Sequence, residues 1–166
     1  TGPQFVQQIN QQALERLKRI QSGELPNPPM WETVPLRLVS IVPGRVEMEA
    51  VADERHINAI GSVHGGFAAT VLDTVLGLAI YTSLGAEARH ITVDLAVKLV
   101  KAIPLNTPLI AASELVHISR SVGVSQAVLR SAEGVVYAHG TTTCMIQRGG
   151  VTAATTWSGS TPSFTT

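Results

Sequence analysis

The sequence has little cysteine and little charge, and each shortage excludes a class of protein. Cys144 is the only cysteine among 166 residues, so an intrachain disulfide framework is excluded. A single thiol is typical of a reducing compartment, and we expect a cytoplasmic location. Because Cys144 falls in a strand-like run, we interpret it as a small core residue rather than a nucleophile.

Charge of one sign is not in excess anywhere in the chain. Twelve basic and twelve acidic residues give a formal net charge of zero, and no basic stripe is present. This excludes nucleic acid as the main partner, because phosphate binding needs clustered Lys and Arg. Charged residues make up only 14% of the chain against 45% hydrophobic residues, which indicates that other subunits cover part of the surface.

Several catalytic motifs are also missing. There is no G-x-S-x-G elbow and no glycine-rich phosphate loop, which argues against a serine hydrolase and a P-loop enzyme. The histidines lack metal-ligand spacing, so we expect no metal and no cofactor, and we interpret four of them as surface or strand residues: His56, His90, His117 and His139. We expect no signal peptide ahead of the first helix, although the chain begins at Thr1 rather than at methionine.

The period of the apolar residues divides the chain. Phe5, Ile9, Ala13, Leu17 and Ile20 recur at helical spacing, which predicts an amphipathic helix over 5–20. A Gly- and Pro-rich linker completes a segment 1–30. One domain then spans 31–148, and a Gly-, Ser- and Thr-rich stretch over 149–166 is expected to be a flexible tail.

Within the domain, strands are predicted over 36–42 and 46–50, a polar loop over 53–64 and a long helix over 65–85. Four further strands are predicted over 90–103, 108–119, 123–131 and 135–147. Their short, turn-rich separators indicate antiparallel hairpins between successive strands. The order is typical of an α+β fold with a meander-like antiparallel sheet.

The helix predicted over 65–85 is apolar on every face, so we expect it to be enclosed nearly all round. A bilayer could enclose it, because about 20 apolar residues span one, and so could a curved sheet. Asp73 is its only charged residue, and a carboxylate at the centre of a spanning helix costs roughly 2.5–3.5 kcal/mol. We therefore expect a soluble protein with no membrane span.

Asp73 itself has two interpretations, which the residue alone supports equally. It is either a structural aspartate bonded to Thr70 or Thr74, or a buried site carboxylate retained for its chemistry. The helix start favours the second, because Val63-His64-Gly65-Gly66 leads into it. Unpaired amides there can bind a thioester oxygen and stabilise an oxyanion. The alternative is a plain capping turn.

These residues carry a family resemblance. The stretch N-A-I-G-S-V-H-G-G-F-A-A-T-V-L-D from Asn58 to Asp73, then T-V-D-L and a strand ending in A-I-P, resembles the PaaI-like acyl-CoA thioesterases of the hotdog superfamily. The resemblance covers residues 35–147. It implies an antiparallel β-sheet wrapped around the long central α-helix, here with an extra N-terminal helix. The implied activity is hydrolysis of an acyl- or aryl-coenzyme A to free acid and CoA.

The resemblance also implies the site. Gly65 matches the amide that polarises the thioester carbonyl, and Asp73 matches the catalytic carboxylate, as nucleophile or general base. Asn58 matches a loop residue that positions water or the carbonyl, and His64 matches the histidine that organises the helix start. Thr92 matches a hydroxyl that assists the attacking water in some members.

Other positions are less regular. Ile91 to Leu99 alternate so that Thr92 falls on the face opposite the apolar residues, and only a twist would aim it inward. Gly77 stands where one branch of the superfamily has a hydroxyl residue. Gly66 is a further candidate for substrate binding. Arg120 is either a contact for a CoA phosphate or a solvated turn residue.

Geometry favours a dimer. Gly65 and Asp73 are eight residues apart, or about 12 Å along a helix, so one carbonyl cannot touch both. Antiparallel helices from two subunits would bring them together across a twofold axis. We expect a homodimer as the active unit and a homotetramer as the assembly.

Two alternative functions stay open at this point. A hotdog dehydratase or hydratase would use His64 and Asp73 to move a proton and would leave the thioester intact. A non-catalytic acyl-CoA-binding protein would bind the ligand without turnover.

Overall fold

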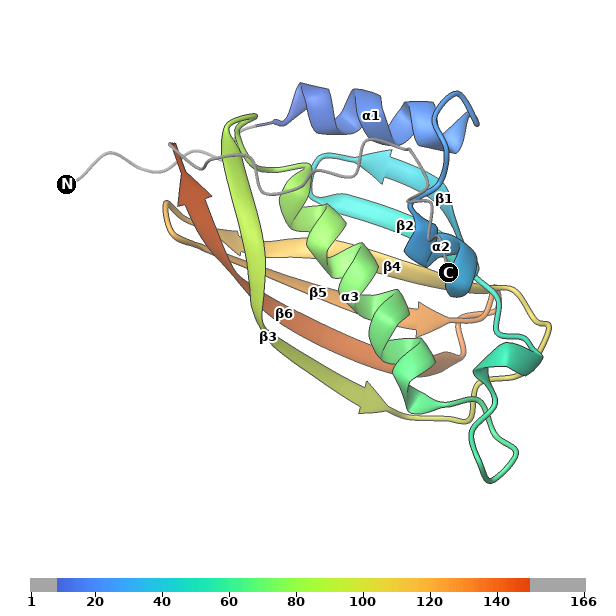
Figure 1. The fold of residues 1–166 in the computed structure, drawn as a ribbon. Coiled ribbons are helices and arrows are strands. Elements are labelled where there is room, and N and C mark those ends of the chain that lie inside the picture. Colours follow the sequence, from blue (N-terminus) through green and yellow to red (C-terminus); the bar gives the residue numbers. More distant parts are fainter. Residues whose placement is uncertain (1–8, 150–166) are drawn as a thin grey trace, which may run out of the picture.

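The computed structural model describes residues 9–149, which form helices on one side of a single sheet (Figure 1). The helices are α1 (Gln11–Gln21), α2 (Pro29–Thr33), the 3-10 turn η1 (Glu54–His56) and α3 (Gly65–Tyr81). The strands are β1 (Leu36–Val42), β2 (Arg45–Ala50), β3 (Ala88–Leu99), β4 (Leu109–Ile118), β5 (Val122–Arg130) and β6 (Val136–Arg148). The predicted order of elements is confirmed, with α2 and η1 as additions.

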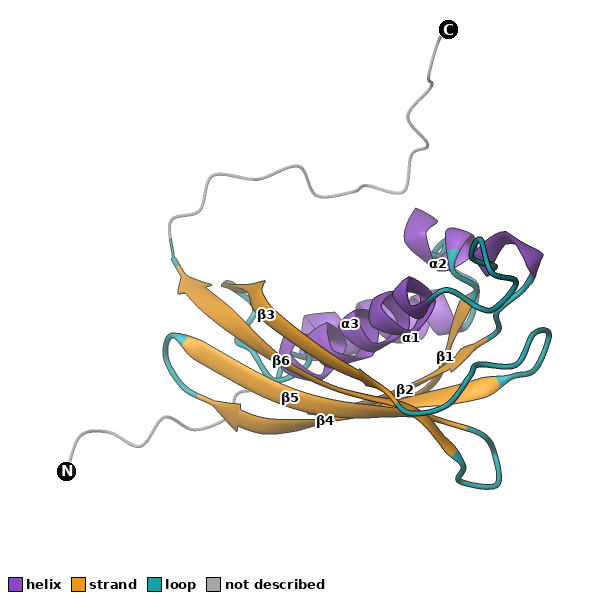
Figure 2. Ribbon diagram, turned by 90° about the horizontal axis from the view of Figure 1, so that it is seen from below, coloured by secondary structure: helices purple, strands orange, loops and turns teal. Residues whose placement is uncertain are grey.

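The six strands form one antiparallel sheet in the order β1-β2-β4-β5-β6-β3. The sheet curves around α3, which lies across its concave face (Figures 1 and 2). The predicted α+β hotdog architecture is therefore confirmed. The expected hairpin between the strands over 90–103 and 108–119 was wrong, because β3 pairs with β6. The connection after β3 passes the segment that follows β2, where the Asn106 N–H donates to the Ala52 carbonyl at 2.7 Å, and β4 then pairs with β2.

Helix α3 is enclosed by the sheet on most sides but not on all of them. Its buried residues are Phe67, Ala68, Val71, Leu72, Val75, Leu76, Ala79 and Ile80. A stripe at three- to four-residue spacing stays at least partly exposed, namely Gly66, Ala69, Asp73, Gly77 and Tyr81. The prediction of near-complete enclosure was thus wrong within one chain, because a single curved sheet leaves the far side of the helix open.

Polar contacts fix α3 at both its middle and its end. The buried Ser125 hydroxyl on β5 donates to the Leu76 carbonyl at 2.8 Å, a bond of the kind that contributes about 1 kcal/mol. The helix ends at Tyr81 rather than at residue 85, because the hydroxyls of Thr82 and Ser83 both donate to the Ala79 carbonyl. The Thr82 hydroxyl also accepts the Gly44 N–H at 3.0 Å.

The N-terminal helix is shorter than predicted in the described region. Asn10 caps it by accepting the Ala13 N–H at 3.0 Å, and Ala13, Leu14, Leu17 and Ile20 are its buried residues. Ile9, predicted to lie on the apolar face, precedes the helix and is 54% exposed. Residues 1–8 and all but Gly149 of the predicted tail lie outside the described residues.

Candidate active site

The start of α3 presents one free amide. His64 is the N-cap, and its Nδ1 accepts the Gly66 N–H at 2.8 Å, so the ring proton is on Nε2. The Phe67 N–H donates to the His64 carbonyl at 2.9 Å. Within residues 9–149 the Gly65 N–H has no acceptor. Of the two glycine amides in the predicted site, only that of Gly65 is available to a ligand.

Any side chain at Gly65 would displace the tip of Leu99. A Cβ at this position would lie 2.7 Å from Cδ1 of Leu99, at the end of β3. The close approach of β3 thus places the end of that strand directly against the first residue of α3.

Asn58 shapes the loop that precedes the helix. Its Oδ1 accepts the N–H groups of Ile60 and Ser62, each at 3.1 Å. The side-chain oxygen is therefore occupied, whereas Nδ2 has no partner among the described residues. The loop is tied to the rest of the domain by His56, which accepts the Asp53 N–H at Nδ1 and contacts the Thr33 carbonyl through Nε2 at 2.9 Å.

Asp73 lies on the open stripe of α3, and the expectation that it is buried was wrong for the single chain. Asp73 lines a hollow of about 360 Å³. The other lining residues are Trp31, Thr74, Gly77, Leu78, Tyr81, His90 and Thr92. The Thr74 hydroxyl donates to the Thr70 carbonyl instead of to Asp73. In the part of the chain that the structure describes, no hydrogen bond or ion pair reaches the Asp73 carboxylate.

A β-bulge brings Thr92 to the same hollow. The register of β3 against β6 shifts between Thr92 and Asp94, so Val93 is an extra residue. Thr92 is paired with buried Cys144, which points toward α3, and its hydroxyl lies 3.7 Å from the Cys144 sulfur. Before the bulge the even-numbered residues of β3 face the helix, and after it the odd-numbered residues do. Thr92 therefore lies on the helix side.

The predicted site residues thus form two groups in one chain. Asp73 and Thr92 share the hollow, whereas Asn58, His64, Gly65 and Gly66 lie at the helix start and do not line it. Arg120 belongs to neither group: it is exposed in the β4–β5 hairpin, where its carbonyl accepts from Arg148.

Sequence reasoning did not assign His90 or Trp31 to the site, although both line the hollow. His90 was interpreted as an ordinary strand residue, and it does lie on β3. Burial lowers the pKa of its imidazole, and the negative charge of Asp73 acts in the opposite direction. Knowledge of the bulge at Val93 would have been needed to place its side chain on the helix side.

Cys144 is buried, in agreement with its interpretation as a core residue, and burial raises the pKa of its thiol. Among residues 9–149, no group of three or more His, Cys, Asp and Glu is placed to hold a metal ion. No helix in that region is long and apolar enough to cross a bilayer.

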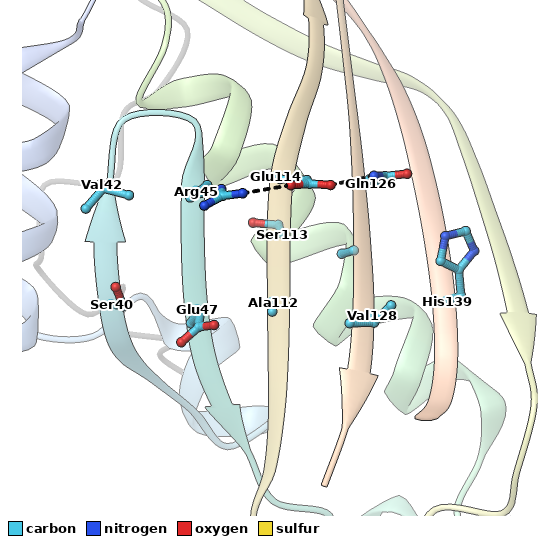
Figure 3. A pocket seen from close by; sticks show the side chains of 11 residues that line it. Ser40, Val42, Arg45, Glu47, Ala112, Ser113, Glu114, Gln126, Val128 and His139 are labelled. Atoms are coloured by element: carbon cyan, nitrogen blue, oxygen red, sulfur yellow. Dashed lines mark hydrogen bonds and ion pairs between the residues drawn. The ribbon is translucent and has the colours of Figure 1, made fainter. Parts of the chain in front are cut away.

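A larger hollow, of about 590 Å³, lies on the sheet face that points away from α3 (Figure 3). Two carboxylates line it. Glu47 contacts Arg130 at 3.7 Å, and Glu114 contacts Arg45 at 3.3 Å and accepts from Gln126 at 2.6 Å. The bonds to Glu114, Gln126 first, lower its pKa. Unlike Asp73, both carboxylates already have partners, so the smaller hollow is the better candidate for chemistry.

The antiparallel sheet curved around one long helix, with a glycine pair at the helix start and an acid on its open stripe, is the arrangement of the hotdog superfamily. A phenylacetic acid degradation-related protein from Ralstonia eutropha JMP134, described as a thioesterase, has this fold. It superimposes with a TM-score of 0.69 and 26% identity over 78% of this chain and 98% of that chain. Zebra fish thioesterase superfamily member 2 superimposes with a TM-score of 0.68 and 25% identity, over 80% of this chain and 96% of that chain.

The chain belongs to the family described as a domain of unknown function, DUF4442, whose model matches residues 20–146. It is also 29% identical to human acyl-coenzyme A thioesterase 13 over 107 residues. The matched region covers 63% of this chain and 75% of the human protein. With its structural neighbours, these matches identify a PaaI-like thioesterase of the hotdog superfamily, as the resemblance in the sequence predicted.

Proposed function

We propose that this protein hydrolyses the thioester of an acyl- or aryl-coenzyme A to a free acid and CoA. One observation carries the proposal. Helix α3 presents an amide at Gly65 and a carboxylate at Asp73, and neither has a hydrogen-bond partner within residues 9–149. The name of the human relative, an acyl-coenzyme A thioesterase, supports CoA as the leaving group.

The two groups suffice for hydrolysis. The Gly65 N–H donates to the thioester oxygen as that oxygen becomes negative. With Asp73 as general base, the carboxylate takes a proton from water while the water oxygen bonds to the carbonyl carbon. The C–S bond then breaks, and the CoA sulfur leaves with the proton. With Asp73 as nucleophile, its oxygen bonds to the carbonyl carbon as the C–S bond breaks, which gives a mixed anhydride and CoA thiolate. Water then hydrolyses the anhydride, freeing Asp73 and the acid, and a proton from that water goes to the thiolate.

The active unit is a homodimer, because the eight residues between Gly65 and Asp73 span about 12 Å of helix. Strand β3 supplies the geometry for joining them. Thr92, near its start, lines the Asp73 hollow, and Leu99, at its end, contacts Gly65. If two copies of β3 pair antiparallel about a twofold axis, the start of each strand lies beside the end of the other. Asp73 then approaches Gly65 of the partner subunit.

The surface of β3 supports this pairing. It is one of the two edge strands of the sheet and is 12 residues long. Its exposed apolar residues are Ile91, Val93, Leu95 and Leu99, followed by Val100. A long apolar edge of this kind is a template for another strand. We propose further that two dimers form a homotetramer in the cytoplasm, which the low charged fraction, 14%, and the single cysteine support.

The remaining residues take subsidiary roles in this proposal. Because Oδ1 of Asn58 is occupied, its Nδ2 donates to the attacking water or to the carbonyl. His64 holds the helix start by capping Gly66, and that bond removes the Gly66 amide from substrate binding. Thr92 assists the water beside Asp73. Arg120, exposed in its hairpin, is available to a CoA phosphate.

The test is thiol release from a panel of acyl- and aryl-CoA thioesters. Asp73→Asn keeps the shape of the side chain, so we expect an intact fold and a kcat lower by roughly 10²–10⁴-fold, the usual contribution of acid–base catalysis. Glu15→Gln is the matched control, because Glu15 is an exposed carboxylate on α1 and has no role in the proposed site or the β3 pairing. Near-normal turnover by Asp73→Asn would reject the role of Asp73.

The same assay separates the two alternative functions. A dehydratase or hydratase would change the absorbance of an enoyl-CoA without releasing thiol. A non-catalytic binding protein would release none at any enzyme concentration while still binding the ligand.

A further inference from the structure

The exposed stripe of α3 has no side chain at Gly77, one turn after Asp73, and a histidine from β3 lies at that position. Gly77 is four residues after Asp73, one helical turn along the same stripe. A Cβ on Gly77 would lie 3.3 Å from Nε2 of His90, a tight contact. The imidazole therefore lies directly against the helix at this glycine.

His90 shares its surroundings with Asp73. Both line the hollow of about 360 Å³, together with Thr92 and Tyr81. The Tyr81 ring is tilted against the imidazole, with centroids 6.2 Å apart. The bulge at Val93 leaves His90 and Thr92 on the helix side of β3. Like the Asp73 carboxylate, the imidazole has no hydrogen-bond partner in the described part of the chain.

We propose that His90 is a positioning residue that acts through Asp73, holding its carboxylate toward the thioester with a ring N–H. The proposal rests on the proposed thioesterase function. A neutral imidazole has one donor and one acceptor, so it can orient the carboxylate without neutralising it. When the ring is protonated, the adjacent positive charge stabilises the carboxylate and reduces its ability to take a proton from water or attack carbon.

The groups around His90 are consistent with a neutral ring at pH 7. Asp73 and Tyr81 face it from α3, and Cys144 lies on the neighbouring β6. Farther along β6, the Arg148 guanidinium donates to the Arg120 carbonyl. Burial lowers the pKa of His90 from 6.5, and the charge of Asp73 opposes that shift. Activity should therefore be lost only as the pH falls below the ordinary histidine range.

The experiment compares two replacements of His90. His90→Leu fills the space without a donor, and His90→Gln keeps a donor that does not titrate. A hydrogen bond to a charged group contributes about 1.5–3 kcal/mol, so we expect His90→Leu to lower kcat about 10- to 100-fold with little change in KM. We expect His90→Gln to retain most of kcat and to move the acid limb of kcat/KM to lower pH, because glutamine, unlike the imidazole, takes up no proton. His139→Gln, on the outer sheet face, is the control.

A third variant changes the helix residue that His90 contacts. Gly77→Ala should raise Tm, because alanine is the better helix former, yet lower kcat, because the new methyl group displaces His90. A space-filling histidine with no other role predicts unchanged kcat and an unchanged acid limb in both His90 variants, and that result would overturn the proposal. If His90→Leu fails to fold, an unshifted acid limb in His90→Gln overturns it alone. Asp73→Asn is assayed in parallel: if it stays active the thioesterase function fails, whereas if it is inactive and the His90 variants behave as wild type, only this inference fails.

Discussion

Leu99 at the end of β3 lies against Gly65 at the start of α3, with its Cδ1 2.7 Å from the position of a missing Cβ. This contact joins the edge strand to the amide that is proposed to bind the thioester oxygen. It also makes the first glycine of the pair sensitive to the smallest substitution.

Gly65→Ala tests that sensitivity. The Leu99 side chain is 59% exposed and can rotate away, so we expect little change in Tm. The shifted Leu99 and the added methyl group should misplace the substrate and lower kcat/KM on the order of 10²-fold. Gly65→Ala/Leu99→Ala should recover part of the loss. Wild-type kcat/KM for Gly65→Ala would show that the thioester does not approach this amide.

Val93→Lys tests the edge of β3. Val93 is 57% exposed, and a lysine there would bring like charges together across a β3–β3 pairing. We expect a monomer by sedimentation and loss of thiol release. Val39→Lys is the matched control, because Val39 is also an exposed valine at a bulge but lies on β1, at the opposite edge. A fully active Val93→Lys monomer would exclude the shared site.

Thr92→Val tests the hydroxyl in the Asp73 hollow. Valine keeps the branched shape and removes the oxygen that lies 3.7 Å from the Cys144 sulfur. We expect kcat to fall about tenfold, the equivalent of one hydrogen bond, with Tm nearly unchanged. Thr92→Ser should retain most of the activity. Equal kcat for the valine variant and the wild type would remove Thr92 from the site.

Asp53→Asn tests the loop before α3 through its pH dependence. The Asp53 side chain accepts from Arg55, which lowers its pKa from 3.8 to about 2. Because the folded pKa lies below the unfolded one, this contribution is present above 3.8 and is lost as the pH falls through about 2. Asp53→Asn should therefore have a lower Tm than wild type at pH 6, and the two curves should converge near pH 2. A constant difference across that range would contradict the charge effect.

The order of elements could be predicted because it depends on local periodicity, and the hollow could not because it depends on tertiary contacts. The helix over Gly65–Tyr81 follows from its apolar residues and its glycine start. The pairing of β3 with β6 does not, because the nine residues that separate β3 from β4 carry no signal for a non-neighbouring strand. The exposure of Asp73 likewise depends on how far one sheet wraps around the helix.

The bulge in β3 could not be predicted from the sequence either. Regular alternation over 91–99 predicted that Thr92 lies on the outer side. The extra residue at Val93 reverses which side chains before it face the helix, so Thr92 faces inward. A bulge leaves no clear mark in the composition of a strand. The position of His90 was missed for the same reason.

Thr82 anchors two other segments at the end of α3 that lies far from Gly65. Its hydroxyl accepts the Gly44 N–H at 3.0 Å, and its carbonyl accepts the Asn10 N–H at 3.1 Å. Removing Asn10 by proteolysis would leave the carbonyl of the fully buried Thr82 without its donor. We therefore expect the start of α1 to be protected from proteases for as long as the central helix stays folded.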